Sequence, residues 1–391
     1  MSKEKICLLA VLSLVSATVF AVNDGSLKFQ NTVRFGYDDN IYQAKDKQGS
    51  ASISDILNIT GKMTFSERSE LLFFWQPEFK YRFDADPESV TYQDLYGRFS
   101  HGISENVFFQ ISDRFRYQDK GAEAGAVDRT DENFVENNLV GGVDFTLSKK
   151  DNVKLGAEYN FRKWDDKNYG KTRGNDYDQF VGNASYLREL KPNKTTGLIG
   201  VNYVDQSYEG SRGGYSATAL YLGVDQNFTP TVTGNFRVGG SYSSVDTGMT
   251  DNDAYAPYLQ GTLLFQTTED TSFTGSIGYS VNKSENSVYN AQDRFNVDFG
   301  MQHKLTGKVT LYSTLGYQLG LYDADYKGSL APAGLSDAKE NLIRFTIRSS
   351  YEINKNNFVD IGYQYVNRDV DVSSLTDYDR NRVDIGWRVR F

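Results

Sequence analysis

The final residues of the chain, RVDIGWRVRF, alternate strictly between apolar and polar side chains. Successive side chains of a β-strand point to opposite faces, so a period of two predicts a strand with one greasy and one polar face. The apolar row contains Val383, Ile385, Trp387, Val389 and Phe391. The polar row contains Arg382, Asp384, Gly386, Arg388 and Arg390. The same alternation recurs over residues 71–83, 153–162 and 342–353.

The length of these segments separates two kinds of all-β protein. A soluble sandwich uses strands of about 5–6 residues, whereas a tilted strand that crosses a membrane needs about 9–11. The alternating segments here run to roughly 10–15 residues, which favours the membrane barrel and leaves the sandwich as the alternative. Slipping the register by one residue would turn Arg344 and Arg348 toward hydrocarbon, at roughly 2–4 kcal/mol each near the midplane.

The connections predict the topology. Short polar turns and mostly longer connections alternate along the chain, as periplasmic turns and extracellular loops do in outer-membrane barrels. We therefore expect a closed antiparallel transmembrane β-barrel of eighteen strands, with sixteen as the alternative and both termini on the periplasmic side. The short turns are expected near 66–70, 103–106, 148–152, 191–194, 229–231, 267–271, 306–308 and 354–357. The longer connections are expected near 39–50, 84–88, 118–131, 166–175, 207–213, 246–252, 283–288, 322–339 and 369–379.

The N-terminus and the composition point to an exported protein. Residues 1–21 have two lysines, an apolar run and a small-x-Ala ending, which is typical of a cleaved Sec signal peptide. The barrel is then expected over residues 22–391, without cysteine, because Cys7 lies in the leader. Aromatic residues make up 14% of the chain and its net charge is −9, which gives no basic footprint for nucleic acid. A mean hydropathy of −0.54 agrees with strands that expose only alternate residues to lipid.

The stretch GYDDN, residues 36–40, places two carboxylates and an amide directly after an aromatic strand. Aromatic residues next to Asp or Asn recur at other long connections, as in KWDDKNY (163–169) and LYDADY (321–326). We interpret them as an aromatic girdle followed by acidic loops that enter water and face lipopolysaccharide. No EF-hand spacing is present, so we expect no dedicated metal site and no cofactor.

The same stretch carries a resemblance to a known family. VRFGYDDNIYQ near the start of an exported all-β chain, together with the C-terminal aromatic Phe391, resembles the putative beta-barrel porin type 2 family. The resemblance implies an outer-membrane barrel and no catalytic residues. Some relatives accompany exopolysaccharide systems, so an outer-membrane component of polysaccharide export or biosynthesis is the alternative function. Phe391 also matches the assembly signal that the barrel-assembly machinery recognises in outer-membrane proteins.

The polar rows supply candidate pore-lining residues, because barrels of sixteen to eighteen strands enclose an aqueous lumen. The candidates are Arg34, Lys80, Arg82, Arg114, Arg116, Arg162, Arg237, Arg344, Arg348, Arg388, Arg390, Glu78, Glu158, Asp298 and Asp384. They either pair along the wall without selecting solutes, or give a mild preference for anions. Phe108 and Tyr312 are expected in the lumen, and the 118–131 and 322–339 loops are candidates for a constriction.

A barrel enzyme is the competing class. Hydrolytic sites usually combine His with Ser or Asp, and the chain has only His101 and His303, both beside expected periplasmic turns. We interpret both as interfacial polar side chains and expect no enzyme activity. The predicted function is a porin-like outer-membrane channel for passive diffusion of small hydrophilic solutes. Oligomeric state is not readable from the sequence.

Overall fold

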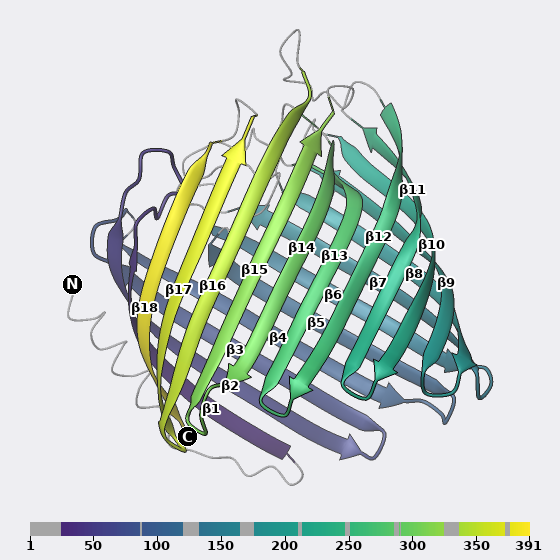
Figure 1. Cartoon of the computed structure of the whole chain (residues 1–391), viewed down its shortest axis with the longest axis horizontal. Coiled ribbons are helices and arrows are strands. Elements are labelled where there is room, and N and C mark those ends of the chain that lie inside the picture. The colour runs from purple at the N-terminus through teal and green to yellow at the C-terminus, as the bar shows by residue number, and fades with distance from the viewer. Residues whose placement is uncertain are drawn as a thin grey trace.

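The computed structural model describes residues 25–391 apart from 87, 120–132, 165–175, 210–212, 247–250, 285–288, 290, 324–335 and 372–375. Eighteen strands form a single antiparallel sheet that closes into a barrel (Figure 1). They are β1 Gly25–Asp38, β2 Ser50–Ser66, β3 Ser69–Arg82, β4 Ser89–Gly102, β5 Val107–Asp119, β6 Asn133–Thr146, β7 Asp151–Trp164, β8 Tyr177–Lys191, β9 Thr195–Tyr208, β10 Gly214–Thr229, β11 Val232–Asp246, β12 Asp251–Thr268, β13 Thr271–Lys283, β14 Ala291–Lys304, β15 Val309–Tyr322, β16 Ala338–Asn354, β17 Asn357–Val370 and β18 Tyr378–Arg390.

Closure occurs between the first and the last strand. Each strand pairs with its neighbours in sequence, and β1 pairs in addition with β18, from Gln30 opposite Arg390 to Asp38 opposite Arg382. The expected closed barrel of eighteen strands is confirmed, and both the sixteen-stranded alternative and the soluble sandwich are excluded. None of the residues that the structure describes lies in a helix long and apolar enough to span a membrane.

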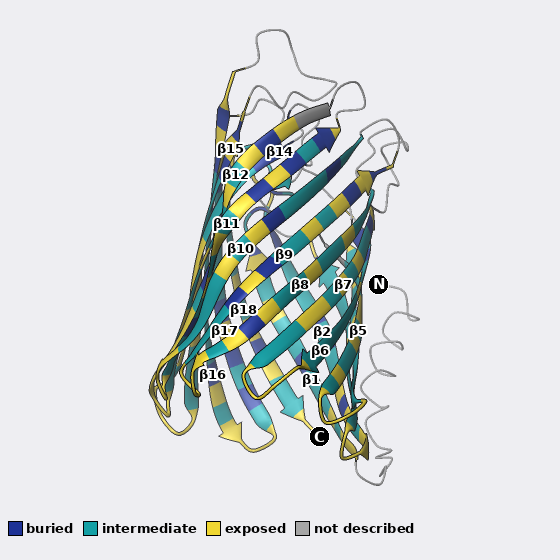
Figure 2. Ribbon diagram, turned by 90° about the vertical axis from the view of Figure 1, so that its right-hand side faces the viewer, coloured by how far each residue is buried: buried dark blue, intermediate teal, exposed yellow. Residues whose placement is uncertain are grey.

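The predicted two-faced strands are present with the predicted register. Ile385 and Trp387 of β18 are 50% and 56% exposed on the outer face, as expected for the apolar row. Residues directly opposite each other in neighbouring strands share a face, so the pairing carries this assignment around the barrel. Figure 2 shows the resulting alternation of exposed and more buried positions along the strands.

Short turns and longer connections lie at opposite ends of the barrel (Figure 1). The short turns join β2 to β3, β4 to β5 and the following alternate pairs, and the C-terminus lies at their end of the molecule. Residues 1–21, the expected signal peptide, fall outside the described residues. The two loops expected to form a constriction also fall largely outside them, because residues 120–132 and 324–335 are not described.

Aromatic side chains gather on the outer face near both ends of the strands. Tyr242 and Tyr255 pack at the long-loop end with ring centroids 5.1 Å apart. Phe265, Phe273 and Phe299 form a stacked row near the short turns, with centroid distances of 6.2 and 5.8 Å. This is the arrangement expected of the two aromatic girdles that flank the apolar band of an outer-membrane barrel.

Candidate channel lumen

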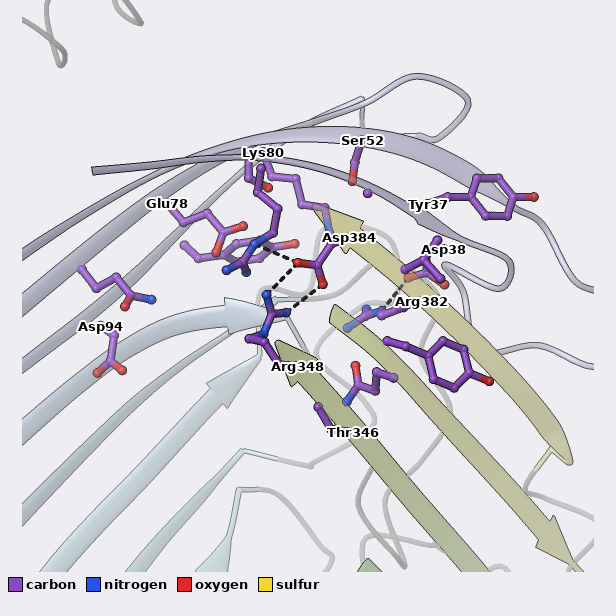
Figure 3. A pocket seen from close by; sticks show the side chains of 18 of the residues that line it. Tyr37, Asp38, Ser52, Glu78, Lys80, Asp94, Thr346, Arg348, Arg382 and Asp384 are labelled. Atoms are coloured by element: carbon purple, nitrogen blue, oxygen red, sulfur yellow. Dashed lines mark hydrogen bonds and ion pairs between the residues drawn. The ribbon is translucent and has the colours of Figure 1, made fainter. Parts of the chain in front are cut away.

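The strand register places all fifteen candidate pore-lining residues on one face of the sheet, the face opposite the exposed apolar row. Asp384 stands opposite Gly36, Arg34 opposite Ser54, and Ser54 opposite Lys80, so these positions share the inner surface. A hollow of about 410 Å³ on this surface is lined by residues that include Arg34, Glu78, Lys80, Arg348, Arg382 and Asp384 (Figure 3). Whether these residues line a conducting pore stays a prediction.

Carboxylates on this face are shared between two arginines. Asp384 lies 3.1 Å from Nε of Arg34 and 2.8 Å from Nη2 of Arg348. Asp38 lies 2.5 Å from Nη2 of Arg380 and 2.7 Å from Nε of Arg382. Each group of three therefore carries one net positive charge. Arg348, Arg380 and Arg382 are held by charge-assisted hydrogen bonds, whereas Arg34 contacts Asp384 as an ion pair.

A third shared carboxylate lies on another part of the wall. Glu136 of β6 accepts hydrogen bonds from Arg116 of β5 and from Arg162 of β7, the latter at 2.7 Å. The guanidinium of Arg162 also lies 4.6 Å from the ring centroid of Phe134. Glu136 is 3% exposed, whereas the side chain of Arg116 keeps 28% of its surface exposed. The excess positive charge thus remains accessible from the interior.

Inward glycines let arginines lie flat across the wall. Gly362 stands between Arg348 on β16 and Asp384 on β18, directly opposite each of them. A Cβ at Gly362 would collide with the guanidinium of Arg348 and with the carboxylate of Asp384. Gly316 occupies the same kind of position between Asp298 and Arg344. The arginines therefore reach across a whole strand to their partners without filling the lumen.

The remaining candidates are distributed around the barrel. Many of them pair along the wall, as the first of the two sequence interpretations expected. Nε of Arg388 lies 2.9 Å from Asp360, Nη2 of Arg237 lies 2.7 Å from Asp225, and Nη2 of Arg114 lies 2.6 Å from Asp94. Glu158 accepts a hydrogen bond of 2.5 Å from Asn138, and the guanidinium of Arg390 lies over the ring of Phe358.

The two aromatic candidates also lie on the inner face. Phe108 of β5 and Tyr312 of β15 are 43% and 42% exposed. Their strands are far apart in the order of the sheet, so the two rings do not belong to one contiguous stretch of wall. The structure therefore gives no aromatic track built from this pair.

The acidic stretch of residues 36–40 has a role that its sequence does not reveal. Asp38 is buried against Arg380, and Asp39 accepts hydrogen bonds from the backbone N–H of Asn381 at 2.6 Å and from its side-chain amide at 2.8 Å. Asn40 donates to the carbonyl of Asp379 at 3.0 Å. The expectation that this stretch only marks an acidic loop entering water is corrected: it joins β1 to β18 at the barrel seam. We call Asp38, Asp39 and Asn40 the seam clasp.

Electrostatics at the clasp follow from these contacts. Partial burial of Asp39 raises the pKa of its carboxyl, but hydrogen bonds from Asn381 and Lys47 outweigh that effect and the pKa lies below its usual value. Lys47 contacts Asp379 as well as Asp39, and its hydrogen bond to Asp379 is the main reason that its pKa is raised. Both groups lie in the 39–49 connection, outside the strands.

The two histidines contact hydroxyl groups on neighbouring strands. Nδ1 of His101 lies 2.7 Å from Oγ of Ser69, and Nδ1 of His303 lies 2.8 Å from Oγ1 of Thr271. The ring of His101 stacks on Phe99 at 6.2 Å, at the short-turn end. Their interpretation as interfacial polar side chains stays a prediction. Across the described part of the chain, no group of three or more potential ligands is arranged to hold a metal ion.

Comparison with solved structures places the fold among outer-membrane channels. OccK2 (OpdF) of Pseudomonas aeruginosa superposes with a TM-score of 0.51 at 11% identity, over 94% of this chain and 98% of that one. OpdK of the same species, solved with vanillate, gives 0.51 at 10% identity over 94% and 99%. The FrpB iron transporter of Neisseria meningitidis gives 0.50 at 12% identity over 93% and 70%. At these identities the likeness concerns the fold alone.

Comparison at the sequence level adds a family. None of the curated proteins matches the chain significantly. The model of the family Putative beta-barrel porin 2 matches residues 213–391, which contain strands β10 to β18. The chain is thus an eighteen-stranded barrel of the outer-membrane type, and its expected resemblance to this porin family is confirmed over residues 213–391.

Proposed function

We propose that the chain is an outer-membrane channel through which small hydrophilic solutes diffuse passively, with a mild preference for anions. The observation that carries the proposal is the inner wall, where Asp384, Asp38 and Glu136 are each shared by two arginines. A wall with excess guanidinium groups attracts anions even when the whole chain is acidic, because permeating ions respond to the charges that line their path. The family match and the barrel fold support the channel itself.

Acidic solutes suit this wall better than neutral ones. The Arg34–Asp384–Arg348 group lines the 410 Å³ hollow, and the side chains of its two arginines are about one-third exposed, at 31% and 28%. An arginine fork can bind a carboxylate through two parallel hydrogen bonds. Among the proteins of similar fold, OccK2 has been solved with glucuronate and OpdK with vanillate. A small carboxylate is therefore the solute class that we propose.

The proposal is tested by reconstituting the purified protein in a planar bilayer with a salt gradient. We expect ion conductance, with a reversal potential whose sign shows that anions are more permeant than cations. The double variant Arg34→Gln/Arg348→Gln leaves Asp384 without either cation. The reversal potential of this variant should therefore shift toward the value of a cation-selective channel. The control Lys149→Gln/Lys150→Gln removes the same charge from a turn outside the wall and should leave the reversal potential unchanged.

Two results would count against the proposal. Absence of any conductance would reject a channel, and equal shifts in both double variants would reject the wall arginines as the source of selectivity. The alternative of a polysaccharide-export component predicts a defect in exported polymer rather than in solute flux when the protein is deleted. No contact among the described residues favours that alternative.

A further inference from the structure

The barrel wall is interrupted between β12 and β13 at the long-loop end. β12 pairs with β11 from Asp251 to Phe265, but its pairing with β13 begins only at Leu259, opposite Tyr279. Asp251–Tyr258 thus has no β13 partner among the described residues. β13 itself continues to Lys283, paired with β14. Past Leu259 and Tyr279, β12 and β13 are no longer paired, and the end of the β13–β14 hairpin is displaced from the barrel wall.

The separated end of the hairpin lies inside the barrel. Val281 and Ala291 belong to rows that face outward lower in β13 and β14, yet they form a buried cluster with Tyr215 and Val245. Tyr215 and Val245 are opposite each other in the register and lie on the inner face. Oη of Tyr215 donates to the carbonyl of Val281 at 2.7 Å. An outward row can meet inward side chains of β10 and β11 only if the hairpin crosses in front of them.

The unpaired edge of β12 contains a proline at a position that faces the gap. The N–H of Gln266 donates to the carbonyl of Thr231, next to β11. Alternate residues of an antiparallel strand bond to opposite neighbours, so the even-numbered residues of β12 face β11 and the odd-numbered ones face β13. The peptide groups of Tyr255 and Pro257 therefore point to the side where β13 is missing. Proline has no N–H, so it leaves no donor unsatisfied at a position whose peptide group lacks a ladder partner. At position 257 any other residue would have an N–H without a β13 acceptor, and Pro257 has none.

The gap reaches the level of the membrane. Tyr255, at the outer aromatic girdle, is 84% exposed beside the edge, and an apolar hollow on the outer face is lined by Leu220, Gly240, Tyr242, Tyr255, Ala256 and Pro257. Across the gap, Oη of Tyr279 donates to Asp293 at 2.8 Å, although both residues belong to outward rows. An open sheet edge is not tolerated against hydrocarbon but is tolerated beside water or a polar group.

We propose that this gap is a lateral portal between the channel interior and the outer leaflet, and that it admits single-chain amphiphiles with an uncharged polar head. The inference rests on the proposed channel function and adds a second solute class to it. The apolar hollow takes the chain of the amphiphile at the acyl boundary. The peptide groups of β12 and the Tyr279–Asp293 pair take hydrogen bonds from its head, and Asp293 disfavours an anionic head by repulsion.

A covalent closure tests the portal. Continuing the register past Leu259 and Tyr279 would place Ala256 opposite Asn282, and the chain beyond Cys7 has no cysteine that would interfere. Ala256→Cys/Asn282→Cys can be joined by oxidation, or by a short bismaleimide if the thiols are too far apart for a disulfide. The control Ser112→Cys/Val140→Cys joins β5 to β6, which are already paired there and are far from the gap in the order of the sheet.

Two rates are measured in cells that express each variant, with and without the cross-link. One is the gain of envelope fluorescence from an NBD-labelled alkyl glucoside, and the other is periplasmic hydrolysis of the hydrophilic β-lactam nitrocefin. We expect closure to lower the first rate several-fold, to that of cells without the protein, and to leave the second unchanged. The control cross-link should alter neither.

The outcomes separate the portal from the channel. If nitrocefin flux depends on the protein but glucoside entry is the same in closed and open forms, the portal is refuted and the channel stands. Glucoside entry no faster than in cells without the protein, with nitrocefin flux intact, also refutes the portal. Loss of both activities in the uncross-linked protein would reject the channel as well.

Discussion

At the scale of single residues, three carboxylates of the inner wall are each shared by two arginines. Asp38 is separated by 342 positions from Arg380 and by 344 from Arg382, so no local pattern in the sequence could pair them. The period of two predicted the polar row that contains Arg382, whereas Asp38 was expected in an acidic loop that enters water. Their partnership was not predictable, because it depends on the register between the first and the last strand. The short motif that carried the family resemblance is thus explained by closure of the barrel.

Replacing Asp38 tests the clasp. Asp38→Asn leaves the buried guanidinium of Arg380, 7% exposed, without a counter-charge. Removal of one partner from a buried ion pair costs about 3–5 kcal/mol, and we expect a loss of unfolding free energy near the lower end of that range. The measurement is urea unfolding in detergent, followed by tryptophan fluorescence. Asp94→Asn, which removes a partner from the more exposed Arg114, should cost about 1 kcal/mol or less. Equal losses would contradict a special role for the seam.

Acid should weaken the clasp in a defined direction. The folded pKa of Asp39 lies below its unfolded value of about 3.9. A depressed carboxyl pKa contributes stability that is present above the unfolded pKa and is lost as the pH falls through the folded pKa. We therefore expect Asp39→Asn to flatten the fall in stability below about pH 4. An unfolding series from pH 6 to pH 2 checks this, and an unchanged acid slope in the variant would refute it.

At the scale of elements, strand positions and turn order followed from periodicity, but two features did not. The inward bend of the β13–β14 hairpin depends on Tyr215, a residue of β10, and on small inward side chains that make room for it. The crossing of Arg348 over Gly362 requires three strands in register. Pro257, which cannot donate a ladder hydrogen bond, lies at the open edge, but Pro77 in the paired strand β3 shows that such a proline does not by itself identify an edge.

Tyr215→Phe should loosen the hairpin. The change removes the hydrogen bond from Oη to the carbonyl of Val281 and leaves that buried acceptor unsatisfied, at about 1–3 kcal/mol. The loss lowers the free energy needed to open the hairpin locally. Amide hydrogen exchange near Val281 should therefore become at least roughly fivefold faster. Tyr312→Phe, at an exposed tyrosine of β15, is the matched control and should leave exchange there unchanged. Identical exchange in both variants would show that the hairpin is held by other contacts.

A methyl group at Gly362 should displace Arg348. In Gly362→Ala the new Cβ occupies the space of the guanidinium, so the bridge to Asp384 is broken and Arg348 is pushed into the lumen. We expect a lower single-channel conductance and a stronger anion preference. Gly142→Ala adds the same methyl to an inward glycine whose nearest neighbour, the carbonyl of Leu155, would lie 3.6 Å away. If both variants conduct alike, the flat path of Arg348 has no influence on the pore.

At the scale of the whole molecule, the prediction succeeded because one constraint dominates. A closed sheet with lipid on one side and water on the other must alternate apolar and polar residues along every strand, and this signal survives in a single sequence. The closed barrel of eighteen strands followed from it. The ion pairs within the wall could not be predicted in this way, because each charged residue of the inner face has several possible partners on neighbouring strands.

Cysteine scanning of two strands, β16 and β18, is the most direct test of whether the barrel encloses water and faces lipid. Single cysteines are placed at residues 343–348 of β16 and 383–387 of β18 in the refolded protein in lipid vesicles, and each is treated with a charged, water-soluble maleimide. Because alternate residues face the lumen and the lipid, the account predicts fast labelling at Arg344, Thr346, Arg348, Asp384 and Gly386, and slow labelling at the residues between them. Equal labelling of both rows, or fast labelling of the apolar row, would contradict a barrel that encloses water and faces lipid.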